Sequence, residues 1–122
     1  MKLSGIILYV QDVEKLKKFY TQHFQFEVVE EILPSWVLLK SGAAELGLHK
    51  AGVAHDTGNI TNGENNNAKL VVETEENIVT LRERLKDMQV NMKDIKTWDN
   101  YEFWLCDGFD PEGNVFQIKQ KK

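Results

Sequence analysis

The order of helix and strand patterns repeats once along this chain, and this repetition limits the fold more strongly than any other feature of the sequence. In the first half, a strand pattern over residues 3–10 leads into an amphipathic helix pattern that Asp12 can cap. Strand-like alternation then recurs in three runs, at residues 26–31, 35–40 and 44–50. The first half is therefore predicted to fold in the order βαβββ.

The second half shows the same order. A strand pattern at residues 70–73 precedes Thr74, a candidate helix cap, and Glu75 and Glu76 would stabilise the first helical turn. Apolar residues then recur at helical spacing, at Ile78, Leu81, Leu85 and Met88. Three strand patterns follow, at residues 90–97, 101–106 and 115–119. The sequence therefore predicts an α+β fold built from two βαβββ modules.

A strongly encoded turn at residues 110–114 introduces the last strand. Its Asp-Pro-Glu-Gly-Asn sequence matches the positional preferences of a type I turn. In the strand that follows, Phe116 and Ile118 share one face, and Gln117 lies on the other. Gln117 is therefore the polar residue whose role most needs explanation.

The length of the chain fits one domain. The 122 residues can bury a core of their own. We predict a single domain, residues 1–122, with the first module at residues 1–50 and the second at residues 68–122. A polar connector rich in Asn and Gly joins them at residues 51–67.

Composition excludes several classes of partner. The formal net charge is −4, and basic residues cluster only in the tail at residues 119–122, so nucleic acid is not an expected partner. The early apolar run at residues 6–10 is too short for a signal peptide or a membrane span. Cys106 is the single cysteine and suits a reducing compartment. We expect a cytoplasmic protein with no membrane partner.

Several of these motifs together resemble a known family. The Tyr-Val-Gln-Asp junction at residues 9–12, the Phe19-Tyr20 pair and the turn at residues 110–114 look like those of the glyoxalase, bleomycin-resistance and extradiol-dioxygenase superfamily, also called vicinal oxygen chelate proteins. The resemblance implies two βαβββ modules whose curved sheets enclose a cavity. It also implies a homodimer with the cavities at the subunit interface.

Metal-dependent members of that family place one ligand on each of four strands. The corresponding positions here appear as Gly5, Gly47, Leu70 and Gln117, with a shift to residues 68–69 open for the third. Two glycines, an aliphatic residue and a carboxamide are poor ligands for a divalent ion. The resemblance therefore predicts no metal site, no cofactor and, on balance, no enzyme. The glycines would leave room for a ligand.

A metal ion could also bind at residues other than these four positions. Glu45 and His49 share a strand face, but they lie about 13 Å apart in an extended strand and cannot chelate one ion. His49 is either a general base, a lone ligand or a hydrogen-bonding histidine of the pocket. His23 and His55 are expected to be structural or solvated.

The aromatic residues favour binding over catalysis. Trp36 and Trp104 are expected either to line the cavity or to pack in the core or dimer interface, and Tyr9 either binds a ligand or seals the mouth. Trp98 and Tyr101 are expected to face each other across a tight turn.

The face that Trp104 occupies depends on the alternation along its strand. If Phe103 and Leu105 face the helix, Trp104 and Cys106 face the ligand. A bulge at residues 107–109 would reverse this assignment.

We therefore predict a homodimer that binds a small organic molecule in an aromatic-lined cavity. The net negative charge weakly favours a cationic or neutral ligand. The alternatives are a metal-dependent lyase, isomerase, dioxygenase or thiol transferase with a relocated site, and a regulatory or scaffolding dimer module. The predicted ligand-binding residues are Tyr9, Trp36, Glu45, His49, Trp104 and Gln117.

Overall fold

The computed structural model describes residues 1–52 and 68–122, and the chain divides into two compact units, Met1–Asn59 and Ile60–Lys122. Most of the predicted connector, including His55, lies outside the described residues. In the described part of the chain, no helix is long and apolar enough to cross a membrane.

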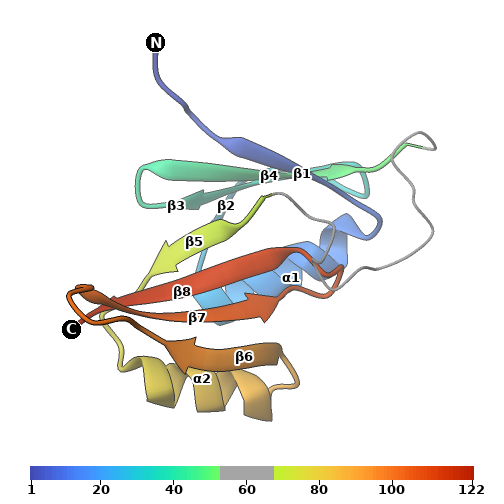
Figure 1. The fold of residues 1–122 in the computed structure, drawn as a ribbon. Coiled ribbons are helices and arrows are strands. Elements are labelled where there is room, and N and C mark those ends of the chain that lie inside the picture. Colours follow the sequence, from blue (N-terminus) through green and yellow to red (C-terminus); the bar gives the residue numbers. More distant parts are fainter. Residues whose placement is uncertain (53–67) are drawn as a thin grey trace. The chain divides into compact units, whose positions relative to one another are not determined.

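The described part of the first unit, residues 1–52, contains one helix and one four-stranded sheet, sheet A (Figure 1). Its elements are β1 (Ile6–Val10), α1 (Val13–Phe24), β2 (Glu27–Ile32), β3 (Trp36–Ser41) and β4 (Ala44–Lys50). The strand order is β1-β4-β3-β2, and only the β1 and β4 pair is parallel.

The second unit repeats this plan in sheet B. Its elements are β5 (Leu70–Glu73), α2 (Ile78–Asp87), β6 (Asn91–Lys96), β7 (Phe103–Phe109) and β8 (Val115–Lys121). The strand order is β5-β8-β7-β6, with β5 parallel to β8 and the other pairs antiparallel. The predicted α+β fold with two βαβββ modules is confirmed.

Helix α1 begins at the Asp12 cap that the sequence predicts. The Asp12 side chain accepts a hydrogen bond from the Lys15 backbone N–H at 3.0 Å, which satisfies one amide that has no partner within the helix. Gln25 ends the helix in the left-handed conformation, with φ of 53°. The apolar stripe of the helix is buried at Val13, Leu16, Phe19 and Tyr20. This stripe fixes α1 on one face of sheet A.

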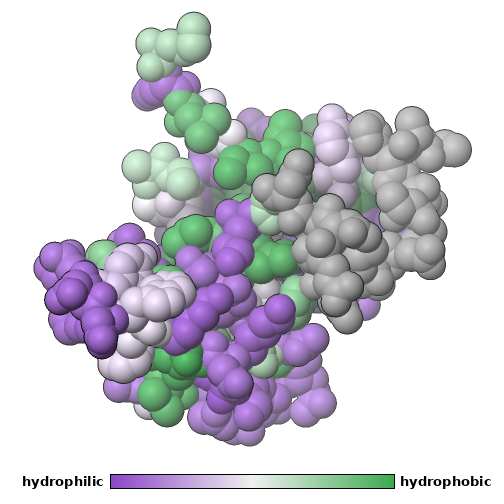
Figure 2. Space-filling view, viewed as in Figure 1, coloured by the Kyte–Doolittle hydropathy of each residue, from purple (hydrophilic) through white to green (hydrophobic). Residues whose placement is uncertain are grey.

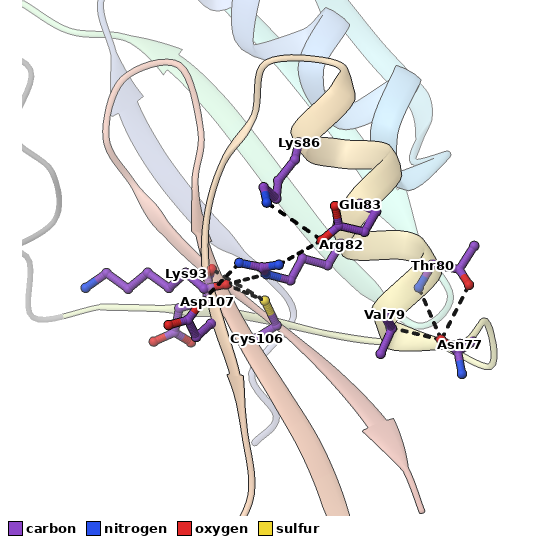
Figure 3. A network of polar contacts seen from close by, with 10 residues as sticks. Asn77, Val79, Thr80, Arg82, Glu83, Lys86, Lys93, Cys106 and Asp107 are labelled. Atoms are coloured by element: carbon purple, nitrogen blue, oxygen red, sulfur yellow. Dashed lines mark hydrogen bonds and ion pairs between the residues drawn. The ribbon is translucent and has the colours of Figure 1, made fainter.

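Helix α2 begins three residues later than predicted, because Asn77 caps it in place of Thr74. The Asn77 side chain accepts from the backbone N–H groups of Val79 and Thr80 at 3.0 and 3.1 Å (Figure 3). Thr74 instead accepts from the backbone N–H of Glu76 in the turn before the helix. The prediction of Thr74 as the cap was therefore wrong, and both glutamates precede the first helical turn.

The apolar stripe of α2 is shorter than predicted. Ile78, Leu81 and Leu85 are buried against sheet B, whereas Met88 caps the helix end and is 44% exposed. In Figure 2, hydrophilic residues dominate the outer surface around α2.

Each sheet has one face covered by its own helix and one face without a helix, which we call the helix-free face. On sheet A the helix side includes Val37, Leu39, Leu46 and Leu48, all of them buried. On sheet B the helix side includes Phe116 and Ile118. Because side chains alternate along strands, the neighbours of these residues in sequence define the helix-free faces.

The closing turn forms as predicted. The Gly113 backbone N–H donates to the Asp110 carbonyl at 2.9 Å, and Gly113 has a φ of 80°. One carboxylate oxygen of Asp110 also accepts from the backbone N–H groups of Glu112 and Asn114. The predicted meeting of Trp98 and Tyr101 is confirmed as well, with ring centroids 5.5 Å apart.

The sequence left open which face of sheet B each residue of β7 occupies, and the strand pairing decides it. β7 continues without a register shift against β8 through residues 107–109, and Cys106 pairs with Ile118 on the helix side. Trp104 therefore lies on the helix side, and Leu105 and Asp107 lie on the helix-free face. Phe103 and Leu105 therefore do not face the helix, and no bulge between β7 and β8 is involved.

Candidate ligand-binding faces

Three predicted site residues form one row across the helix-free face of sheet A. His49 in β4 pairs with Tyr9 in β1 on one side and with Trp36 in β3 on the other. The ring centroids are 5.4 Å apart for Tyr9 and His49, and 6.0 Å apart for Trp36 and His49. Tyr9 is 55% exposed. The register of the three strands thus builds a continuous aromatic row.

Gly47 allows the Trp36 indole to lie against the sheet. A Cβ atom at Gly47 would lie 2.5 Å from Cη2 of Trp36 and 3.0 Å from Cγ1 of Ile7. These distances are too short, so only glycine fits here while the indole keeps its position. The indole Nε1 of Trp36 also donates to Oε2 of Glu30 in β2 at 2.9 Å. The space predicted for a ligand above Gly47 is therefore filled by Trp36, which the hydrogen bond holds in place.

His49 is fixed in one tautomer when neutral. Its Nδ1 lies 2.8 Å from the carbonyl oxygen of Lys50. Because a carbonyl oxygen can only accept, Nδ1 carries the proton, and Nε2 keeps its lone pair. His49 can therefore accept a hydrogen bond from a ligand.

Glu45 lies on the same face as His49, as predicted. It pairs with Lys40 of β3, and a Cβ added at Gly5 would lie 3.1 Å from the Glu45 carbonyl oxygen. Glu45 and Gly5 are thus neighbours across β4 and β1, two rows away from His49. At this edge of the face the backbone of Gly5 lies close to Glu45, which contributes a carboxylate.

The helix-free face of sheet B centres on a carboxylate that the sequence analysis missed. Asp107 in β7 is only 8% exposed. Its Oδ1 accepts from Nε2 of Gln117 at 2.8 Å, and its Oδ2 accepts from Nζ of Lys69 at 2.9 Å. Nζ of Lys96 in β6 lies 3.7 Å from the same Oδ2. Gln117, predicted as a site residue, is therefore a donor within a four-residue polar cluster.

Asp107 is held in its ionised form. Burial alone would raise the pKa of its carboxyl, but hydrogen bonds from Lys69 and Gln117 and the positive charges of Lys69 and Lys96 lower it below the ordinary 3.8. At neutral pH the cluster therefore contains one carboxylate and two ammonium groups.

Trp104 lies apart from these residues. It is on the helix side of sheet B, 39% exposed, and Nζ of Lys122 lies 5.1 Å from the centre of its ring. The structure therefore does not group Trp104 with Gln117 on one face.

Cys106 is buried on the helix side, and its environment is unreactive. Its Sγ donates to the Lys93 carbonyl oxygen at 3.2 Å, and Nε of Arg82 donates to the same oxygen at 2.7 Å (Figure 3). Burial raises the pKa of the Cys106 thiol, and the nearby Arg82 charge opposes this only in part. Cys106 is a structural residue of the core.

The usual metal-ligand positions do not supply a ligand set. Leu70 pairs with Phe116 and points to the helix side, so the helix-free residue at this end of sheet B is Lys69. The positions are then occupied by Gly5, Gly47, Lys69 and Gln117, which offer neither imidazole nor carboxylate. Within residues 1–52 and 68–122, no three His, Cys, Asp or Glu side chains gather into a metal-binding group.

Solved structures share this fold at low sequence identity. The fosfomycin resistance protein FosX from Listeria monocytogenes is 18% identical with a TM-score of 0.79, covering 100% of this chain and 94% of its own. TnmS3, an antibiotic binding protein from Streptomyces sp. CB03234, is 20% identical with a TM-score of 0.75, covering 100% and 97%. Lactoylglutathione lyase from Agrobacterium tumefaciens is 18% identical with a TM-score of 0.75, covering 98% and 92%.

Sequence comparison gives the family. No curated protein sequence matches the chain. The sequence profile of the Glyoxalase/Bleomycin resistance protein/Dioxygenase superfamily matches residues 2–118, nearly the whole chain, and the fold of both units agrees with it. The protein therefore belongs to the Glyoxalase/Bleomycin resistance protein/Dioxygenase superfamily.

Proposed function

We propose that this protein binds a small organic molecule on the helix-free faces of its sheets, without a resident metal ion and without converting the ligand. The row formed by Tyr9, His49 and Trp36 carries the proposal, because three rings meet there on an incompletely buried face. Flat, rigid side chains bind planar or apolar ligands at a small cost in conformational entropy.

The polar groups near the row would orient such a ligand. Nε2 of His49 can accept a hydrogen bond from it. Glu45 adds a carboxylate two rows away on the same face. A ligand with an aromatic body and a few polar substituents fits this combination.

The donor set supports binding without metal. A divalent ion needs imidazole, carboxylate or several oxygens, and Gly5, Gly47, Lys69 and Gln117 do not provide them. Lys69 would in addition place a positive charge beside a positive ion. We therefore derive no catalytic step through a metal.

Two of the structural neighbours bear names consistent with this proposal. One is an antibiotic binding protein and another is a fosfomycin resistance protein, whereas a third is a lyase. We infer that the ligand here is of drug-like size and that the protein works as a homodimer in the cytoplasm. Size-exclusion chromatography with light scattering would test the dimer, and fractionation of cells would test the location.

Tryptophan fluorescence tests the binding proposal. The tag-free protein is titrated with a panel of planar aromatic compounds, cationic, neutral and anionic, and with small 2-oxo acids. We expect at least one aromatic compound to change the emission saturably, and the change to disappear in Trp36→Phe but persist in Trp98→Phe. Elemental analysis of the same sample should show no stoichiometric Ni, Zn, Mn or Fe. A stoichiometric metal would instead favour the enzyme alternative.

A further inference from the structure

We propose that the ammonium group of Lys69 serves as a tethered cation on the helix-free face of sheet B and binds an anionic oxygen of the ligand. This inference deepens the proposed function and rests on it. It assigns the ligand of this face as a small organic molecule that carries a carboxylate or a comparable singly charged acid group.

The strand registers place Lys69 at a position equivalent to Gly5. In the first unit, Ile7 of β1 pairs with Gly47 of β4, and in the second unit Val71 of β5 pairs with Gln117 of β8. Gly5 and Lys69 each lie two residues before the paired residue, and therefore on the same face. Lys69 thus occupies a position where metal-dependent relatives present a ligand, and it brings a cation instead.

Asp107 and Gln117 hold this cation in place. The Asp107 carboxylate accepts from Nζ of Lys69 at 2.9 Å, and Gln117 fixes the other carboxylate oxygen at 2.8 Å. An ammonium group has three N–H donors, and the bond to Asp107 uses one. The Lys69 side chain is 38% exposed, so its remaining donors can reach a ligand.

The cluster carries more positive charge than its carboxylate balances. Both Lys69 and Lys96 lie within 3.7 Å of Oδ2 of Asp107. Two ammonium groups against one carboxylate leave one positive charge, which suits one anionic group of a ligand.

The rest of the helix-free face of sheet B is also positively charged. By strand pairing it also carries Lys119 and Lys121 of β8 and Glu73 of β5. The chain has a net charge of −4, yet lysines outnumber carboxylates on this face. The overall charge suggested a cationic or neutral ligand, but the local charge favours an anionic one, and the local field decides binding.

A matched pair of ligands tests the inference. We would measure by calorimetry the affinities of 2-naphthoate and of its uncharged analogue 2-naphthamide, which share the aromatic body. We expect the wild-type protein to bind the acid about tenfold more tightly, which corresponds to about 1.4 kcal/mol. Lys69→Met should remove this preference, whereas Lys69→Arg should keep most of it. Lys86→Met is the control, because Lys86 lies on α2 with a similarly exposed side chain.

Each outcome has one meaning. Equal affinity for acid and amide in the wild-type protein would overturn the inference and leave the proposed function standing. An acid preference that survives in Lys69→Met would also overturn it, because the cation would lie elsewhere. If neither compound binds, the inference falls together with the proposed function for aromatic ligands. Loss of the acid preference in Lys69→Met alone, with amide affinity unchanged, supports the inference.

Discussion

The helix-free faces of the two units share a framework but differ in chemistry. Equivalent strand pairs give equivalent rows, so the row of Tyr9, His49 and Trp36 on sheet A corresponds to the row of Glu73, Lys119 and Leu105 on sheet B. The next row, Ile7, Gly47 and Leu38, corresponds to Val71, Gln117 and Asp107. One face is aromatic, and the other is an ion-pair cluster.

This difference shows that two modules with the same fold can present different chemical groups on equivalent faces. On sheet A a glycine makes room for an indole, which offers contact area with little charge. On sheet B the equivalent position holds Gln117, which donates to Asp107 and so helps to fix a cation. The first face therefore offers aromatic contact area, and the second offers positive charge.

The largest effect on stability is expected where the second face loses its central carboxylate. Asp107→Ala removes the acceptor for Lys69 and Gln117, so we expect the free energy of unfolding to fall by about 1–3 kcal/mol. Urea unfolding measures this loss. Asp94→Ala is the control, since that carboxylate is exposed and pairs only at the surface with Arg82. Equal losses in the two variants would show that the cluster is not a structural centre.

A smaller loss is expected when Gln117 becomes acidic. Gln117→Glu places a second carboxylate beside Asp107 and removes the donor to its Oδ1, and we expect a cost of about 1–2 kcal/mol at neutral pH. Repulsion between the two carboxylates would raise the pKa of the pair, so one proton binds between them as the pH falls toward 4. The loss of unfolding free energy should then become smaller. The exposed Gln89→Glu is the control. A cost independent of pH would argue against repulsion between the two carboxylates.

The Asp107 carboxyl also predicts the direction of acid sensitivity. Its pKa is lowered in the fold because the Lys69 and Gln117 hydrogen bonds and the lysine charges outweigh burial. A lowered pKa contributes stability above the unfolded value, and this contribution is lost as the pH falls below about 4 through the folded pKa. The stability difference between wild type and Asp107→Asn should therefore be constant at neutral pH and narrow in acid. A difference that widens in acid would contradict the lowered pKa.

The smallest effect on stability, and the clearest effect on binding, is expected at Gly47. A methyl group there meets the far end of the partly exposed Trp36 ring, which can shift because a single exposed hydrogen bond to Glu30 holds it, so we expect Gly47→Ala to cost under about 1 kcal/mol. The displaced indole should change the tryptophan emission and weaken aromatic ligands. Gly108→Ala is the contrast, because its methyl group would meet Phe116 and Met92 on the helix side of sheet B and should cost more. A reversed order would mean that Trp36 is as fixed as the core.

The local patterns of the chain were sufficient to predict its architecture. Amphipathic spacing, the Asp12 cap and the turn at residues 110–114 act over a few residues, so the sequence alone shows them. The cap of α2 was misplaced because Thr74 and Asn77 are both good caps. Only the fold shows that Asn77 accepts from the backbone N–H groups of Val79 and Thr80 while the Gln120 side chain accepts from that of Ile78.

The candidate site was only half predictable. The row on sheet A follows from strand parity, which placed Tyr9 and His49 correctly on one face. The cluster on sheet B was missed because the sequence left open which face each residue of β7 occupies, so Asp107 was not assigned to this face. Its bond to Lys69 joins residues 38 positions apart, and no local pattern encodes such a contact. The third metal-ligand position shifted from Leu70 to Lys69 for the same reason, because the register with β8 decides which face each residue takes.

The central claim is that this protein binds an organic acid without a metal ion. The most direct measurement is the dissociation constant of 2-naphthoate for protein freed of metal by exhaustive chelation, compared with the same protein after addition of Ni²⁺, Zn²⁺, Mn²⁺ or Fe²⁺. The account predicts saturable binding to the metal-free protein and an unchanged dissociation constant with each metal. Binding that vanishes on chelation and returns with one of these ions would contradict it.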